Sequence, residues 1–438
     1  MSVSDVADVD VVNVPPKARV QMPTKLRSLR QVARTEVAPT LSCVELFAGC
    51  GGLALGLARA GFEHLKVVEL DDQAHATLAE NKRRELKHVA EWPLVHDDVA
   101  NVKYADLGRS VDLVAGGPPC QPFSIGGKHL GPADDRNMWP EAIRAVRELK
   151  PGAFLFENVR GLLRPAWAEY LQYLELALSW PSFALRDGED WKQHLLRLRQ
   201  LAKGQDPPAR EYRVLIRPIN AADYGAPQKR HRAIIMGVRR DVVAEWDFPA
   251  PTHSREALLW DQHVEDGYWE RHGISPPALV ADTTAARLVA KLRTSEVKPA
   301  EMAWVTVRDA LNGLPAPTAD AEPITHHRLR PGARAYRKHT GSAWDEPSKA
   351  LKAGDHGVPG GENMLAEPDG SVRYFTLREM ARLQGFPDDF NFGDGWKRPI
   401  RQLGNAVPVQ VGACFGAHLY DLLTRAGKLE AAAAEARK

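Results

Sequence analysis

The chain has 438 residues, of which 44% are hydrophobic and 26% are charged, and its formal net charge at pH 7 is +2. This composition allows a large buried core and excludes fibrous and wholly disordered proteins. Because the net charge is small, a nucleic-acid surface would depend on local clusters of cations. The cysteines, which are Cys43, Cys50, Cys120 and Cys414, have neither metal-ligand spacing nor the density of a disulfide scaffold, so we expect no metal site.

The N-terminal region resembles neither a secretory signal nor a membrane anchor. It carries acidic residues where a signal would be basic and then apolar, and no apolar stretch reaches membrane-spanning length. We therefore expect an intracellular protein without a membrane partner. Residues 1–40 lack hydrophobic periodicity and change from acidic to basic. They predict a disordered extension with a solvated basic half, and the alternative is a phosphate-binding arm.

Short apolar runs alternate with helix-like stretches from residue 41 onward. Strands are expected at 43–49, 65–70, 94–99, 111–117, 153–159, 212–220 and 231–238. Helices are expected at 53–60, 72–87 and 138–150. Apolar strands that alternate with amphipathic helices predict an α/β fold with a doubly wound, mostly parallel sheet.

Two segments depart from this alternation. Residues 166–208 predict a helical insert, rich in Trp and Leu, to which no function is assigned. From about residue 248 to 375, Pro, His and Arg become frequent, which predicts a smaller, loop-rich second domain. Helical periodicity returns at 376–386 and 407–426. We expect an extension at 1–40, a first domain at 41–247 and a second domain at 248–398. A C-terminal segment at 399–430 is expected to return to the first domain.

A glycine-rich turn follows the first expected strand, with Gly49, Gly51 and Ala54 in a Gly-x-Gly-x-x-Ala pattern. Such a turn lets the backbone approach a ligand at a helix N-terminus. Glu69 follows Gly49 by twenty positions, near the spacing at which a carboxylate binds ribose. Together they favour an adenine nucleoside over close packing alone. Asp98 would bind the adenine amino group or cap a helix, and the cofactor could be NAD or S-adenosylmethionine.

Reactive side chains are expected at neighbouring strand ends. Cys120 lies in "GGPPCQPFS", just after the fourth apolar run, and Glu157 ends the fifth. Because ligands of open α/β sheets bind outside the carboxyl ends of the strands, the thiol and the carboxyl are expected in one pocket. Arg230 and Arg232 in "QKRHR" are spaced to share one face of a strand. Each feature alone has a structural explanation, but their joint occurrence favours a catalytic site.

The ordered motifs "FAGCGG", "GGPPCQPFS", "ENV", "QKRHR", "REMARLQGFP" and "QLGNAVP" make the chain resemble a bacterial DNA (cytosine-5) methyltransferase over about residues 41–425. The resemblance implies a Rossmann-like, S-adenosylmethionine-dependent methyltransferase sheet with a target-recognition domain at 248–398. It implies methylation at C5 of a cytosine flipped out of double-stranded DNA, in a restriction-modification system or by a solitary methylase. It also implies a cytoplasmic, nucleoid-associated monomer, with a cognate restriction endonuclease as a candidate partner.

The resemblance also implies residue roles. Cys120 would attack C6 of the base and Glu157 would contact N3. Arg232 would bind O2, and Arg230 would support the pocket. The implied cofactor contacts are Phe47, Gly49, Gly51, Gly52, Glu69, Leu70, Asp98, Val99, Asn405 and Ala406. The implied DNA contacts are Gln121, Ser124 and Gln228.

A basic run at residues 326–340 surrounds Tyr336 with Arg328, Arg330, Arg334, Arg337 and Lys338. We expect it to contact DNA phosphates, and the alternative is a solvated basic loop.

Three alternative functions remain open. A Rossmann oxidoreductase explains the glycine turn, but it needs no Pro-Pro-Cys loop paired with Glu-Asn-Val. A catalytically inactive DNA-binding homologue is disfavoured because Cys120 and Glu157 are both present. An RNA cytosine-5 methyltransferase would use the same motifs, and the long variable segment at 248–375 favours DNA.

Overall fold

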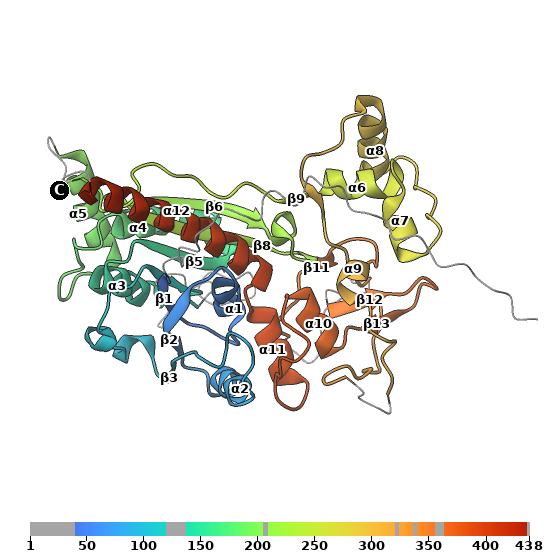
Figure 1. The fold of residues 1–438 in the computed structure, drawn as a ribbon, viewed down its shortest axis with the longest axis horizontal. Helices are drawn as coiled ribbons and strands as arrows, with labels where there is room; N and C mark the ends of the chain where they lie inside the picture. Colours follow the sequence, from blue (N-terminus) through green and yellow to red (C-terminus); the bar gives the residue numbers. More distant parts are fainter. Residues whose placement is uncertain are drawn as a thin grey trace, which may run out of the picture. The chain divides into compact units, whose positions relative to one another are not determined.

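The computed structural model describes residues 40–119, 137–204, 209–319, 324–335, 340–354 and 363–435. Within these residues, a seven-stranded sheet has the strand order β3-β2-β1-β4-β5-β8-β6 (Figure 1). Its strands are β1 (Ser42–Leu46), β2 (Glu63–Glu69), β3 (Leu94–His96), β4 (Leu113–Gly116), β5 (Ala153–Val159), β6 (Tyr212–Asn220) and β8 (His231–Arg239). Strands β1 to β5 pair in parallel, and β8 runs antiparallel to both β5 and β6. The expected doubly wound, mostly parallel sheet is therefore confirmed.

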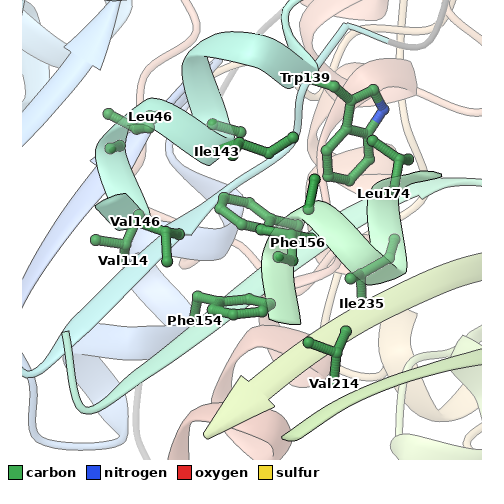
Figure 2. Close-up of a cluster of buried hydrophobic side chains, with 14 of the residues drawn as sticks. Leu46, Val114, Trp139, Ile143, Val146, Phe154, Phe156, Leu174, Val214 and Ile235 are labelled. Atoms are coloured by element: carbon green, nitrogen blue, oxygen red, sulfur yellow. The ribbon is translucent and has the colours of Figure 1, made fainter. Parts of the chain in front are cut away.

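Side chains along the central strands alternate between two hydrophobic clusters. Phe154 and Phe156 of β5 pack on one face with Trp139, in the cluster that Figure 2 shows. Their neighbours Ala153 and Leu155 belong to the cluster on the other face. Because side chains of a strand point alternately to the two faces, both faces of the sheet are buried. The covering helices are α3 (Trp139–Leu149) and α4 (Ala168–Ser179) on the first face, and α1 (Gly52–Arg59) and α12 (Val409–Glu435) on the second.

The expected helical insert at 166–208 supplies part of the main core. Helix α4 connects β5 to β6, and its Tyr170 and Leu174 are buried in the same cluster as Phe154. Helix α5 (Trp191–Lys203) packs on α4 and begins with a capping box at Asp190. The Leu content of α4 therefore reflects a helix that packs against both the sheet and α5.

The expected loop-rich region also contains helices. They are α6 (Arg255–His263), α7 (Gly267–His272), α8 (Thr284–Ser295) and α9 (Val307–Leu311). Side chains of Ser254, Thr283 and Thr306 accept backbone N–H groups at the starts of α6, α8 and α9, as N-caps do. Within the described residues, three pairs of short strands accompany the helices. They are β9 (His253–Ser254) with β10 (Met302–Ala303), β7 (Gln228–Lys229) with β11 (Ser348–Lys349), and β12 (Met364–Ala366) with β13 (Val372–Tyr374).

The C-terminal part of the chain, from residue 377 onward, returns to the glycine turn. Helices α10 (Leu377–Leu383) and α11 (Lys397–Asn405) share a hydrophobic cluster with α1 and with α2 (Asp72–Arg83). Helix α12 lies against α1, where a Cβ on Gly56 would come within 2.6 Å of the backbone of Gly412. Only glycine allows this approach. Among the described residues, no helix combines the length and apolar character needed to cross a bilayer.

Candidate active site

Glu157 and Arg232 form an ion pair at the carboxyl end of β5. The antiparallel register of β5 and β8 places Val159 opposite Arg232 and Ile234 opposite Glu157, so the two charged residues are diagonal neighbours. Arg232 Nε lies 2.6 Å from Glu157 Oε1. Glu157 is buried, with 8% of its surface exposed. Because an unpaired buried carboxylate is costly, Arg232 holds Glu157 in a defined position.

The chain that leads to Cys120 lies beside this ion pair. A Cβ on Gly117 would lie 4.0 Å from Glu157 Oε2. Asn158 Nδ2 donates a 3.1 Å hydrogen bond to Pro118 O. The structure thus brings Glu157 next to the start of the Pro-Pro-Cys loop. Cys120 itself, together with Gln121 and Ser124, lies outside the described residues.

Arg230 lies just before strand β8, whereas Arg232 lies in it. We expected both side chains on one face of a strand. Its guanidinium is buried and donates to Leu351 O at 3.1 Å and Gly404 O at 2.9 Å. Strand β8 begins only at His231, so the alternation rule does not apply to Arg230. The same-face expectation stays a prediction, and the hydrogen bonds of Arg230 tie its own segment to the backbone at Leu351 and Gly404.

Gln228 does not lie on a DNA-facing surface, so its expected DNA contact needs correction. Its side chain is fully buried. Its Nε2 donates to Gln384 Oε1 at 3.1 Å, and its Oε1 accepts the N–H of Leu351 at 2.9 Å. Both ends of the amide are used inside the protein.

The turn after β1 and the end of β2 form a single backbone cradle. Phe47, Gly49 and Gly51 have positive φ angles of 56°, 57° and 84°, and a Cβ on Gly49 would meet no atom within 4 Å. The carboxylate of Glu69 accepts the N–H of Gly49 at 2.6 Å and that of Asp71 at 2.7 Å. Burial raises the pKa of Glu69, while these two hydrogen bonds act to lower it. Glu69 is therefore pre-oriented beside open space.

The residues expected around an adenine ring differ in accessibility. Leu70 is 60% exposed, whereas Val99 is 3% exposed and belongs to the main core. The carboxylate of Asp98 accepts the N–H of Ala100 at 2.9 Å and caps the 3-10 turn Val99–Asn101. The capping role that the sequence left open for Asp98 is thus present.

The late motif "QLGNAVP" meets the glycine turn. A Cβ on Gly52 would lie 2.2 Å from Val407 O and 3.4 Å from Ala406 Cβ, so this contact requires glycine. Asn405 ends α11 and is exposed. Cys50 also lies at this junction, where burial raises its pKa to about 12 and makes it a poor nucleophile.

The basic run is described only in part. Arg328, Arg330 and Arg334 are exposed, whereas Arg337 and Lys338 lie outside the described residues. Arg328 Nε donates to Ala319 O at 2.9 Å, and the Arg330 guanidinium lies 4.8 Å from the centre of the Trp396 ring.

The sequence does not indicate that Asn158 and Gln384 connect distant segments. Both lie inside quoted motifs, "ENV" and "REMARLQGFP", but their hydrogen-bond partners are 40 and 156 positions away in the chain, at Pro118 and Gln228. Only the folded chain reveals such partners.

Known proteins resemble this chain over most of its length. A type II methyltransferase, M.PspPI from Psychrobacter sp., is 31% identical over 394 residues, which are 90% of this chain and 82% of that protein. M.Eco47II of Escherichia coli, also a type II methyltransferase, is 30% identical over 386 residues, covering 88% of this chain and 80% of the relative.

One solved structure supports the fold. A prophage-encoded E. coli protein, described as a DNA modification methyltransferase, matches 88% of this chain and 99% of its own, with a TM-score of 0.52 and 23% identity. The sequence profile of the C-5 cytosine-specific DNA methylases matches residues 41–178 and 208–419. The chain therefore belongs to the C-5 cytosine-specific DNA methylase family and is a DNA (cytosine-5) methyltransferase.

Proposed function

We propose that the enzyme methylates C5 of a flipped cytosine in a specific duplex DNA sequence through a covalent bond between Cys120 and C6, as the modification enzyme of a restriction-modification system. The ion pair between Glu157 and Arg232 carries this proposal. It places a carboxyl and a guanidinium at the end of β5, beside the chain that leads to Cys120. A carboxyl and a cation beside a thiol can activate a pyrimidine ring that is otherwise a poor nucleophile at C5.

The side chains would divide the chemistry as follows. The Cys120 thiolate forms a bond to C6, which moves electron density to C5. A proton shared between the Glu157 carboxyl and N3 of the base draws electrons away from C6 and returns to the carboxyl when the ring is released. Arg232 donates to O2 while it holds Glu157 in place. After C5 accepts the methyl group, loss of the C5 proton to a base and cleavage of the bond from sulfur to C6 release Cys120. The base must leave the stack before these groups can reach it.

The residues around the glycine turn fit S-adenosylmethionine. Glu69 would accept hydrogen bonds from the ribose hydroxyls, because the N–H groups of Gly49 and Asp71 already orient its carboxylate. Exposed Leu70 would cover one face of the adenine, and Asp98 would accept from its amino group. The open space at Gly49 lets the ligand approach the backbone. When bound, the cofactor supplies an electrophilic methyl group on a sulfonium.

The function is tested by expressing the protein in a methylation-deficient host. We expect plasmid DNA to become resistant to a subset of restriction enzymes, and bisulfite sequencing to show 5-methylcytosine at one position of one sequence. The cognate restriction endonuclease should cut this same sequence when it is unmethylated. Methylated RNA together with unmethylated plasmid would contradict the proposal.

The affinity for S-adenosylmethionine should depend on the protonation of Glu69. Burial raises its pKa, so in the free protein it takes up a proton at a higher pH than an ordinary glutamate. A protonated carboxyl accepts ribose hydroxyls poorly. The affinity should therefore be complete above this raised pKa and fall as the pH drops through it. Calorimetry over a series of pH values, from neutral into the acid range, measures the effect.

Glu69→Gln is the matched control for this pH dependence. This variant should bind S-adenosylmethionine more weakly than the wild type at pH 8. Its affinity should not fall further as the pH is lowered. If the wild type and Glu69→Gln show the same pH profile, Glu69 is not the titrating contact.

We propose that residues 248–398 recognise the target and that their basic run binds DNA phosphates. Arg334 is the best described candidate, because it is exposed and has no hydrogen-bond or ion-pair partner among the residues that the structure describes. Arg334→Ala should weaken binding to cognate and scrambled duplexes alike. It should also make the plot of the logarithm of the binding constant against the logarithm of the salt concentration less steep, by about 1 in slope. Fluorescence anisotropy at several salt concentrations measures both effects.

Arg425→Ala serves as the control for the loss of one positive charge. Arg425 lies on α12 and pairs with Asp421, so its removal should leave the salt slope unchanged. An Arg334→Ala variant that binds like the wild type at every salt concentration would mean that the run is a solvated loop. A loss confined to one base position would instead indicate that Arg334 reads a base edge.

A further inference from the structure

We propose that Gln384 is a positioning residue that couples the cofactor site to the catalytic strand β8, an inference that rests on the proposed function. Gln384 follows α10 and is fully buried. A buried primary amide must satisfy two donors and an acceptor inside the protein, so its partners are fixed. Those partners lie on the two parts of the active site that must act together.

On one side, Gln384 holds the cofactor-covering segment, which we define as residues 403–409. Its Nε2 donates to Leu403 O and, at 3.4 Å, to Ala406 O. Its backbone O accepts the N–H of Val409 at 2.9 Å. These contacts hold the bend between α11 and α12 from both ends.

This bend is the part of the segment that meets the glycine turn. A Cβ on Gly52 would lie 2.2 Å from Val407 O, so the carbonyl of Val407 touches the first residue of α1. A shift of residues 406–407 would therefore displace the turn at Gly49 to Gly52, and with it the N–H of Gly49 that orients Glu69. Gln384 thus acts on the cofactor site without touching the cofactor.

On the other side, Gln384 holds β7, the short strand that comes just before the catalytic strand β8. Its Oε1 accepts a 3.1 Å hydrogen bond from Gln228 Nε2, and Gln228 lies four positions before Arg232. Arg230, between them, donates to the carbonyls of Leu351 and Gly404 and so reaches the same segment. One buried hydrogen-bond network therefore connects Ala406, Gln384, Gln228 and the strand that carries Arg232.

Gln384→Met tests the cofactor side of this coupling. Methionine has a similar volume but no comparable donor or acceptor, so the bonds to Leu403 and Ala406 are lost with little change in packing. We expect the Kd for S-adenosylmethionine to rise about tenfold, within the usual range of coupling between sites. Calorimetry measures the Kd, and thermal unfolding of the same sample measures the stability.

Gln228→Met tests the catalytic side. It removes the link to β8 but leaves the amide of Gln384 bonded to the cofactor-covering segment. Its Kd for S-adenosylmethionine should stay within about twofold of the wild type, while kcat at saturating cofactor falls. A general loss of stability would not produce this division of effects between the two variants.

Arg378→Lys is the matched control. Arg378 is fully buried in α10 and donates to the carbonyls of Thr325, Pro387 and Phe390, none of which lies in the cofactor-covering segment. It should lower the unfolding temperature without changing the Kd. The inference is overturned if Gln384→Met binds S-adenosylmethionine like the wild type, or if Arg378→Lys weakens binding equally. If the wild type itself fails to bind S-adenosylmethionine, the proposed function fails instead.

Discussion

Cys120→Ala should abolish methyl transfer to DNA, while the affinity for S-adenosylmethionine stays within about twofold of the wild type. Cytosine reacts at C5 only after a nucleophile has added to C6, and alanine supplies no nucleophile. The cofactor contacts that we propose, in contrast, are at Gly49 and Glu69, on the turn after β1 and the end of β2. Transfer of labelled methyl groups to cognate duplex and calorimetry with the cofactor measure the two effects separately.

Duplex DNA with 5-fluorocytosine at the target position makes the covalent step visible. Fluorine at C5 cannot leave as a proton, so the wild type should remain attached to the DNA, and Cys120→Ala should not. Cys414→Ala is the control, because Cys414 lies on α12 and burial raises the pKa of its thiol. This control should methylate DNA and form the adduct. An adduct with Cys120→Ala would show that another group is the nucleophile.

Where a local pattern determines structure, the sequence was a sufficient guide. The strands of the sheet have apolar runs of strand length, and the side chains of β5 alternate between two cores as strand geometry requires. The position of Glu157 followed from the rule that ligands bind at the carboxyl ends of parallel strands. That rule needs only the position of each strand in the sequence and the direction of the chain, both of which local patterns indicate.

Where a side chain depends on distant backbone, the sequence was not sufficient. Arg230 and Gln228 have the residue types of a DNA-binding or catalytic surface, yet both are buried and hydrogen-bonded to the backbone of Leu351, more than 100 positions later in the chain. Periodicity could not indicate this, because the bend before His231 interrupts the strand. Polar residues that join segments and polar residues that face substrate look alike in a sequence.

The helices that we did not predict have a different physical reason. Helix α8 has an N-cap at Thr283 and buries only Val289 and Leu292, in a small cluster with α6. Its apolar stripe is narrow, and prolines and charged residues surround it, so the periodic signal is weak. The cap at Thr283 was the available indication, since threonine before an alanine-rich segment favours a helix start.

The effects of the two carboxylates of the site should be separable by mutation. Glu69 and Glu157 both end strands of the same sheet, but the first is bonded to backbone N–H groups and the second to a guanidinium. Glu69→Ala should raise the Kd for S-adenosylmethionine about 10-fold to 100-fold, because hydrogen bonds to a charged group contribute about 1.5–3 kcal/mol each. At saturating cofactor, its kcat should remain close to that of the wild type.

Glu157→Gln should show the opposite behaviour. Glutamine has the same shape and keeps an oxygen beside Arg232, but it cannot pass a proton to N3, so kcat should fall about 10²-fold to 10⁴-fold. The Kd for S-adenosylmethionine should not change, since no described hydrogen bond or ion pair joins Glu157 to the glycine turn. Calorimetry and single-turnover methylation of both variants decide the matter. Equal loss of cofactor binding in Glu69→Ala and Glu157→Gln would show that Glu157 belongs to the cofactor site rather than to the base.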